Sequence, residues 1–263
     1  APAIYGIGIG LTGAVFFVIS AALIFAEPFS VVFEPKIALV MIGVGLSRYL
    51  LATWFFYESI KTGDMSVTTP IVGSKIIVVT IISLILGLET LSILQVIAII
   101  LATAGFITVT FHLRKLERLH RASLIKCIIF ALAASLCWSI GDIFVKKINY
   151  INPLTITLGS LFYAWIFYFI FILSLKKHKM VFAMSSLDKK RYFLHGVLSF
   201  ALTYFILNLS LVKFGIIRTN IITHLWPLIA SIVGYIRYRE KLFFSKICGA
   251  IMLLASFLLV IFN

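Results

Sequence analysis

The sequence predicts an all-α integral membrane protein made of two inverted repeats of five transmembrane helices, nine of which are visible. Two observations lead there: the apolar composition and an internal duplication. Hydrophobic residues make up 62% of the 263 residues and charged residues only 12%. A water-soluble domain could not bury that much apolar surface. The apolar runs are continuous rather than alternating, which excludes a transmembrane β-barrel and leaves helices to satisfy the backbone hydrogen bonds.

The duplication has a constant offset of 151 residues along the chain. Four pairs of corresponding residues mark it: Pro2 and Pro153, Glu89 and Glu240, Gln95 and Lys246, and Phe111 and Phe262. Internal repeats of this size are typical of secondary transporters, in which the substrate site lies between the two copies.

Each predicted helix is an apolar run long enough to cross the hydrocarbon core, which takes roughly 20 residues. The first run begins at Ala1, contains no charge, and lacks the basic start and short core of a signal peptide, so we interpret it as a true span. The nine runs are 3–26, 37–58, 66–88, 91–112, 123–145, 153–175, 192–213, 217–236 and 243–262.

The run that begins at Ala1 corresponds to the run that begins at Pro153, which is the second helix of its repeat. The first repeat therefore lacks its first helix, and either a tenth helix precedes Ala1 or the protein is a nine-helix variant. Five crossings separate Pro2 from Pro153, so the two repeats have opposite orientations in the membrane. The predicted domains are a first repeat, a loop and a second repeat, over 1–112, 113–122 and 123–263.

The net charge of +14 is concentrated in loops on one side of the predicted membrane. Counted by loop parity, fifteen Lys and Arg lie on one side and five on the other. Loops rich in Lys and Arg stay in the cytoplasm, so the loops at 113–122, 176–191 and 237–246 are expected there, with Asn263 outside. The charge is thus a topology signal and an attraction to anionic lipid headgroups, and we expect no nucleic-acid partner.

Motifs that would indicate an enzyme or a pump are absent from the sequence. It has no GxxxxGK[ST] loop for ATP, no HExxH and no GxSxG, so we expect no enzyme activity and no cofactor. Cys127, Cys137 and Cys248 fall inside predicted helices without a CxxC or Cys/His cluster. We therefore expect them to be packing residues, with no metal site.

The segment YESIKTGDMSVTTPIVGSKIIVVTIISLILGLETLSILQVIAIILATAGFI (57–107) contains a Lys-x-Gly turn, a mid-span Pro, a Gly-x-Glu corner and a final Gly-containing helix, and 211–253 repeats this order. The pattern resembles the third to fifth helices of the EamA-type transporters of the drug/metabolite transporter superfamily. The resemblance implies ten helices in two inverted five-helix repeats, alternating access, and a central cavity lined by the first, third and fourth helices of each repeat. It also implies that both termini face the cytoplasm, which disagrees with the orientation that the loop charges predict.

Basic side chains lie deep in three predicted spans. Arg48 and Lys75 fall near the centres of their spans, and His224 lies about one turn from the centre of its own. Burying Arg or Lys in a membrane costs at least ~2.5 kcal/mol, so these groups should face the bundle interior or a wet cavity. We expect Arg48, Lys75 and His224 to contact substrate. Structural roles for Arg48 and His224, as a buried cation and as a core histidine with satisfied hydrogen bonds, are the alternatives.

Acidic side chains lie nearer the span ends. Glu58 is about ten residues from Arg48 on the same helix, and Asp142 is near the end of 123–145. The midplane is therefore expected to be short of carboxylates and able to accept an anionic group. Glu58 and Asp142 are candidate proton carriers, although a bridge between Lys75 and Asp142 is an open alternative.

Aromatic and amide side chains are expected to complete a small-molecule pocket, because such pockets are mostly apolar with a few convergent polar groups. Some of them share helix faces through spacings of three or four residues. Aromatic residues near span ends could equally belong to an interfacial belt. The candidates are Trp54, Tyr57, Trp138, Tyr204, Asn208 and Trp226.

Two further pairs of residues suggest how the helices begin and bend. Pro70 and Pro227 remove backbone hydrogen bonds within predicted helices, so they are candidate hinges. Glu89 and Glu240 precede the last helix of each repeat, where a carboxylate can satisfy free backbone donors together with Ser92 or Ser245.

The sequence thus predicts a secondary-active transporter that moves a small polar metabolite, anionic or zwitterionic, by alternating access. A lipid or polyprenyl-phosphate flippase is the alternative, because a basic groove open to the bilayer would suit such a lipid. The expected partners are a small-molecule substrate, membrane lipids and a coupled ion or proton, for a monomer or homodimer in a prokaryotic cytoplasmic membrane.

Overall fold

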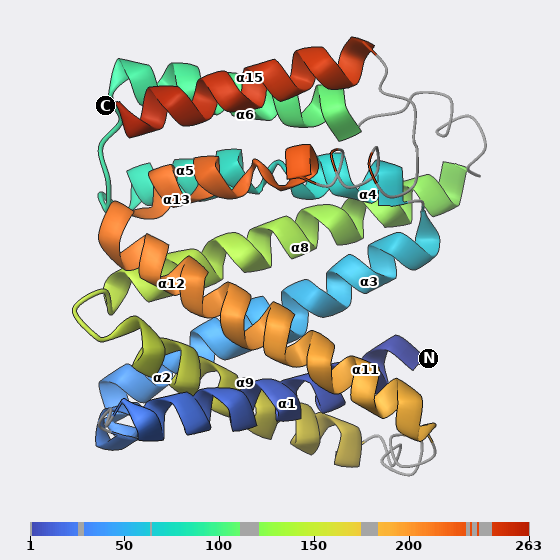
Figure 1. The fold of residues 1–263 in the computed structure, drawn as a ribbon, viewed down its shortest axis with the longest axis vertical. Helices are drawn as coiled ribbons and strands as arrows, with labels where there is room; N and C mark the ends of the chain where they lie inside the picture. The colour runs from blue at the N-terminus through green and yellow to red at the C-terminus, as the bar shows by residue number, and fades with distance from the viewer. Residues whose placement is uncertain are drawn as a thin grey trace. The chain divides into compact units, whose positions relative to one another are not determined.

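The computed structural model describes residues 2–25, 29–63, 65–110, 121–174, 184–229, 232, 236 and 244–262, which form helices joined by short turns (Figure 1). No strand occurs in these ranges. Seven helices within them are long and apolar enough to cross a membrane, and Ser245–Ile261 is a shorter apolar helix. The chain is therefore an all-α multi-pass membrane protein, as predicted. The predicted span 217–236 is described only in part.

The helices form two compact units, one of residues 1–54 and 140–213 and the other of residues 55–139 and 214–263. Each unit draws segments from both predicted repeats. The division into 1–112, 113–122 and 123–263 concerns sequence repeats rather than these units and stays a prediction. Most of the predicted linker lies outside the described residues.

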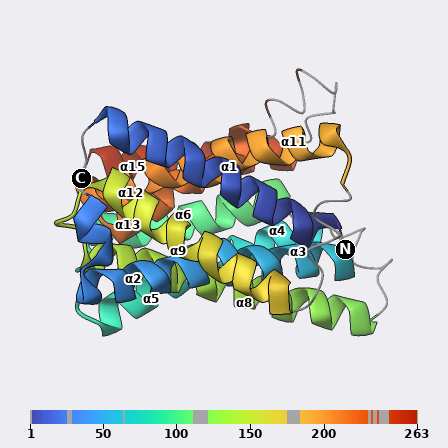
Figure 2. The same cartoon turned by 90° about the horizontal axis from the view of Figure 1, so that it is seen from below.

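The first unit is built around two helices that each begin at a proline, α1 and α9. Its elements are α1 (Pro2–Ile24), η1 (Phe29–Phe33), α2 (Pro35–Val44), η2 (Gly45–Ala52), the end of α8 (Arg121–Lys147), α9 (Pro153–Ser174), α11 (Ser186–Gly196), η3 (Val197–Leu202) and most of α12 (Thr203–Phe214). Helix α1 packs against α9, α11 and η3, while α9 packs against α2 and η2 (Figure 2). Small residues allow the closest approach, because a Cβ on Gly196 would overlap the backbone of Gly10.

The third helix of each predicted repeat contains a π-helical stretch, η2 in one and η3 in the other. At the end of each stretch a threonine hydroxyl donates to the carbonyl five residues before it. Thr53 donates to Arg48 at 3.3 Å, and Thr203 donates to Leu198 at 2.8 Å. π-Helical turns are rare and occur often at functional sites.

The second unit contains two long helices that lie side by side, α6 and α15 (Figure 1). Its elements are most of α3 (Thr53–Thr62), α4 (Met65–Val72), α5 (Lys75–Ile85), α6 (Ile93–Thr110), the first part of α8, α13 (Ile216–Thr223) and α15 (Phe244–Ile261). A Cβ on Gly105 would lie 2.8 Å from the carbonyl oxygen of Gly249, so the two backbones pack directly on each other. The described parts of α6 and α15 occupy corresponding positions of the two predicted repeats, 151 residues apart.

Two spans of the second unit are broken rather than continuous. A turn at Gly73 and Ser74 separates α4 from α5, and a turn at His224 and Leu225 follows α13. The same hydrogen bonds close both turns, because Ser74 N donates to Ile71 O at 3.0 Å and Leu225 N donates to Ile222 O at 3.1 Å. Corresponding atoms in the two turns are again 151 residues apart.

One predicted boundary is wrong. The predicted loop 176–191 is shorter on its C-terminal side, because α11 begins at Ser186 with Ser185 as its N-cap, whose hydroxyl accepts from Asp188 N at 3.1 Å.

Glu89 satisfies backbone donors at a helix start, as expected, and the helix is α13. Its carboxylate accepts from the backbone N–H groups of Ile216 and Ile217.

The start of α6 is capped by its own residues. Ser92 Oγ accepts from Gln95 N at 3.2 Å, and Gln95 Oε1 accepts from Ser92 N at 3.0 Å. This reciprocal pair satisfies two free donors and bears out the expected role of Ser92. Glu240 lies outside the described residues.

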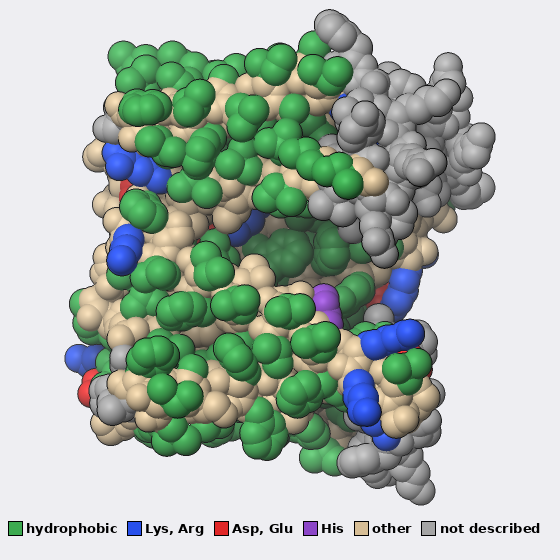
Figure 3. All heavy atoms as spheres, viewed as in Figure 1, with side chains coloured by type: hydrophobic (Ala, Val, Ile, Leu, Met, Phe, Trp, Pro, Cys, Tyr) green, Lys and Arg blue, Asp and Glu red, His purple; other side chains and the backbone are tan. Residues whose placement is uncertain are grey.

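Hydrophobic side chains cover much of the face drawn in Figure 3, including the surface over α15 and over α1. Ile93 and Ile251 are 80% and 61% exposed. Exposed apolar side chains of this number would favour aggregation in water, whereas they suit helices in contact with lipid.

Candidate functional site

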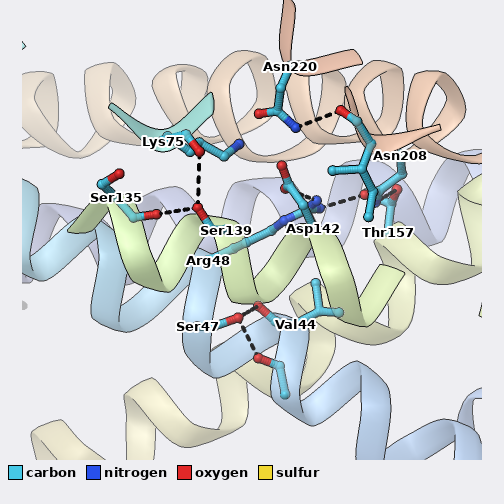
Figure 4. A network of polar contacts seen from close by, with 12 residues as sticks. Val44, Ser47, Arg48, Lys75, Ser135, Ser139, Asp142, Thr157, Asn208 and Asn220 are labelled. Carbon is cyan, nitrogen blue, oxygen red and sulfur yellow. Dashed lines mark hydrogen bonds and ion pairs between the residues drawn. The ribbon is translucent and has the colours of Figure 1, made fainter. Parts of the chain in front are cut away.

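The first unit contains a buried polar network centred on Arg48, which lies in the π-helical stretch η2 (Figure 4). One terminal nitrogen of the guanidinium donates to Asp142 Oδ1, and the other donates to Asn208 Oδ1 at 2.7 Å. Asn208 in turn donates to Thr157 Oγ1 at 2.9 Å. The three residues Arg48, Asp142 and Asn208 are each 0% exposed. Segments that are distant in sequence thus converge on a single ion pair.

Asp142 lies five residues before the end of α8, which runs to Lys147. That the midplane is short of carboxylates stays a prediction. The preceding residue, Gly141, leaves room for the arginine, because a Cβ there would overlap the aliphatic part of the Arg48 side chain. A buried cation of this size requires a paired acid, and the close packing of α8 supplies it.

An aromatic ring, that of Tyr204, lies over the guanidinium group of Arg48. The Arg48 Cζ atom lies 5.7 Å from the centre of the Tyr204 ring, within the range of a cation–π interaction. Tyr49 is buried and its ring centre is 4.5 Å from that of Tyr204. Sequence reasoning identified Tyr204 and missed Tyr49 and Thr157. Tyr49 could have been found from its position next to Arg48. Thr157 could have been found as a polar residue in the mostly apolar helix α9.

Trp54 lines a separate, apolar cavity of about 410 Å³ in the same unit. The cavity lies among residues of α1, η2, α3 and α9, and it does not include Arg48. Its lining residues include Ile7, Leu46, Leu50, Trp54, Phe167 and Tyr168. Such a lining suits a hydrophobic group rather than a charged one.

The second unit holds the other predicted cation, Lys75, which is the first residue of α5. Ser139 Oγ lies 3.4 Å from the Lys75 carbonyl oxygen and donates to Ser135 O at 2.8 Å, and Ser135 also contacts Ser74 (Figure 4). Lys75 is partly buried. A group of serine hydroxyls therefore lies along α8 beside the break that precedes Lys75.

His224 lies in the second break, and its ring contacts two backbone carbonyls. Nδ1 is 2.6 Å from Asn220 O and Nε2 is 2.8 Å from Gly73 O. Phe106 packs against His224 at 5.0 Å and against Trp226 at 5.7 Å between ring centres. The ring is buried between these two carbonyls, and substrate contact by His224 stays a prediction.

The remaining candidates occupy different environments in the same unit. Glu58 forms an ion pair with Lys61 in which both side chains are partly exposed. The rings of Trp138 and Tyr57 pack on Phe56, at 5.6 and 6.1 Å between centres. Substrate contact by these residues stays a prediction.

Both predicted hinges lie next to a helix break. Pro70 is three residues before Gly73, and Pro227 is three residues after His224. Pro70 lies within α4, where it removes one ladder hydrogen bond. Motion at either proline stays a prediction.

Comparisons with known proteins agree with this architecture. No curated protein gives a significant match. A solved crystal structure is similar in fold, with a TM-score of 0.74, 10% sequence identity, and coverage of 98% of this chain and 86% of the other. Residues 125–262, just over half of the chain, match the model of the EamA-like transporter family. A multi-pass helical membrane protein with this match is a transporter of the drug/metabolite transporter superfamily: the chain belongs to the EamA-like transporter family.

Proposed function

We propose that this transporter moves a small metabolite that carries a carboxylate, by secondary-active alternating access. The observation that carries the proposal is the ion pair between Arg48 and Asp142, in which neither side chain is exposed. Arginine binds carboxylates through paired hydrogen bonds, and an ionised group within a membrane segment commonly marks a substrate or ion pathway.

The pairing of Arg48 favours a zwitterionic substrate. An unpaired charge is costly at this depth, so the site should remain close to neutral throughout the transport cycle. A substrate carboxylate that displaces Asp142 from Arg48 would leave the Asp142 carboxylate in need of a cation. The ammonium group of a zwitterion supplies that cation directly, whereas a simple anion requires a proton on Asp142.

Neighbouring groups would orient such a substrate. Asn208 offers an amide beside Arg48, and the Tyr204 ring covers the guanidinium. Of the two candidate proton carriers, Asp142 is the buried one, because Glu58 pairs with Lys61 near the surface. We therefore assign proton exchange, where the substrate is an anion, to Asp142.

A lipid flippase is the second candidate, and the apolar cavity beside Trp54 is the observation that favours it. A cavity of about 410 Å³ without a charged lining residue could hold part of an acyl chain. The buried ion pair lies outside this cavity, so a lipid headgroup would need a separate polar path.

Counterflow in proteoliposomes distinguishes these substrates. Vesicles containing the protein are loaded with a neutral amino acid, with the matching carboxylic acid that lacks the amine, or with a fluorescent phospholipid. We expect exchange of the zwitterion in the wild type and its loss in Asp142→Asn, with Glu58→Gln as the matched control that retains exchange. Exchange of the phospholipid alone would overturn the proposal in favour of the flippase.

A further inference from the structure

His224 has an unusual hydrogen-bonding arrangement: both of its ring nitrogens face a backbone carbonyl oxygen. The distances are 2.6 Å from Nδ1 to Asn220 O and 2.8 Å from Nε2 to Gly73 O. The side chain is 5% exposed. Carbonyl oxygens only accept hydrogen bonds, so each contact is a hydrogen bond only when the nitrogen carries a hydrogen.

The break in the helix explains why Gly73 O is available. In a continuous α-helix this oxygen would accept from the N–H of Ile77. Ile77 N instead donates to Ser74 O at 2.9 Å, because the turn between α4 and α5 tightens the hydrogen bonding. The Gly73 carbonyl therefore leaves the helical ladder and points to a partner on another helix.

A neutral imidazole carries one N–H and can make one of the two hydrogen bonds, whereas an imidazolium carries two and makes both. From this geometry we infer that His224 is a proton-binding site of the transporter. Proton binding closes a clamp between the break after α4 and the end of α13, and proton release opens one side of the clamp. The ligand is the proton itself, and no other reactant is needed.

Lys75 is the charged group that acts on His224 from a neighbouring element, because it begins α5 two residues after Gly73. Helix α13 also packs against α6 and α15. Helix α6 has no titratable residue, α15 carries Lys246 and Cys248 near its start, and α13 itself carries Arg218.

Repulsion between Lys75 and a protonated His224 would link the proton to any anionic group that binds at Lys75. An anionic group bound at Lys75 would offset this repulsion and so favour the protonated histidine. By the reciprocity of linked equilibria, the proton on His224 would raise the affinity for the anion by the same factor. This last step depends on the proposed transport function, whereas the proton site itself does not.

Nitrogen-15 NMR of histidine-labelled protein in lipid bilayers tests the site without any transport measurement. His224→Gln identifies the His224 signals by their disappearance, and His195→Gln removes an exposed histidine as the matched control. Across the pH range in which the protein stays folded, the wild-type ring should change from two N–H groups at acidic pH to one at alkaline pH. A ring with the same number of N–H groups at every pH in this range would overturn the inference.

The clamp is tested by hydrogen exchange in the turn from Gly73 to Ile77. At the acidic end of that range these amides should exchange at least ~10-fold more slowly in the wild type than in His224→Phe, equal to about 1.4 kcal/mol of added protection. The two proteins should differ much less at the alkaline end. Equal exchange in both at acidic pH would show that protonation does not close the clamp. Because NMR and exchange need no substrate, their outcome is independent of whether the proposed transport is observed.

Discussion

Arg48 and Asp142 are 94 positions apart in the chain, yet their side chains form an ion pair in which neither is exposed. The guanidinium also bonds to Asn208, so the arginine is held from two sides. An ion pair at this depth is a weak source of stability, because desolvating both charges offsets most of their attraction. Removing one partner alone, however, leaves an uncompensated charge.

Asp142→Asn is therefore expected to lower the free energy of unfolding by about 3–5 kcal/mol. Thermal and denaturant unfolding of the purified protein measure this loss. The double variant Arg48→Gln with Asp142→Asn should recover more than half of it, since neither charge remains. Glu58→Gln is the control, because its partly exposed pair with Lys61 should be worth no more than about 1 kcal/mol. Losses that simply add in the double variant would show that the two residues are not coupled.

Lys75→Gln tests the second predicted cation. If Lys75 binds an anionic group of the substrate, uptake should fall at least ~10-fold, which corresponds to about 1.4 kcal/mol of differential binding, while the melting temperature changes little. The competing expectation is a bridge to Asp142, whose loss would cost about 3–5 kcal/mol of stability. Uptake and melting temperature measured on the same variant separate the two. A marked loss of stability in Lys75→Gln, with uptake per folded protein unchanged, would contradict the substrate role.

Glu89 is expected to stabilise the start of α13, because its carboxylate accepts hydrogen bonds from two backbone N–H groups there. Glu89→Ala should lower the unfolding free energy by about 1–2 kcal/mol, as for loss of an N-cap, and Glu89→Gln by less because one oxygen remains. The order of the two melting temperatures is the measurement. Equal effects of Ala and Gln would assign the role to packing rather than to the carboxylate oxygens.

Two glycines at one helix contact should differ in their tolerance of a methyl group. A Cβ on Gly196 would overlap the backbone of Gly10, whereas a Cβ on Gly10 would lie 3.3 Å from its nearest neighbours. Gly196→Ala is expected to destabilise by about 1–3 kcal/mol or more through overpacking, and Gly10→Ala by clearly less. Melting temperatures of the two variants give the comparison, and a Gly196→Ala protein as stable as the wild type would refute the close contact.

Composition and the continuous apolar runs predicted most of the fold, because in a membrane such runs can satisfy their backbone hydrogen bonds only as helices. The duplication also anticipated that α6 and α15 are both helices at corresponding positions. The sequence named Pro70 as a candidate hinge but did not predict the break at Gly73, because hydropathy does not show which backbone hydrogen bonds a helix keeps. It also did not predict that Glu89 caps α13, because the chain position of a capping residue does not reveal a partner 127 residues away.

For the site, residue type was informative and the pairing of charges was not. Arg48, Asn208 and Tyr204 were identified because polar and aromatic groups are conspicuous in apolar spans, and the structure brings them together. The ion pair between Asp142 and Arg48 was not predicted, because residue type does not show which charged groups on different helices will meet.

Gly73 and His224 occupy corresponding positions of the two repeats, and a hydrogen bond joins them. If the two copies are inverted as the sequence predicts, the twofold axis that relates them passes through this contact, because corresponding positions can meet only on the axis. The histidine would then belong to neither copy more than to the other, although only one copy supplies its ring. If the copies also exchange conformations during transport, groups away from the axis would change sides, whereas this ring would keep its place. Any preference of a bound proton for one side of the membrane would then have to come from groups that lie away from the axis.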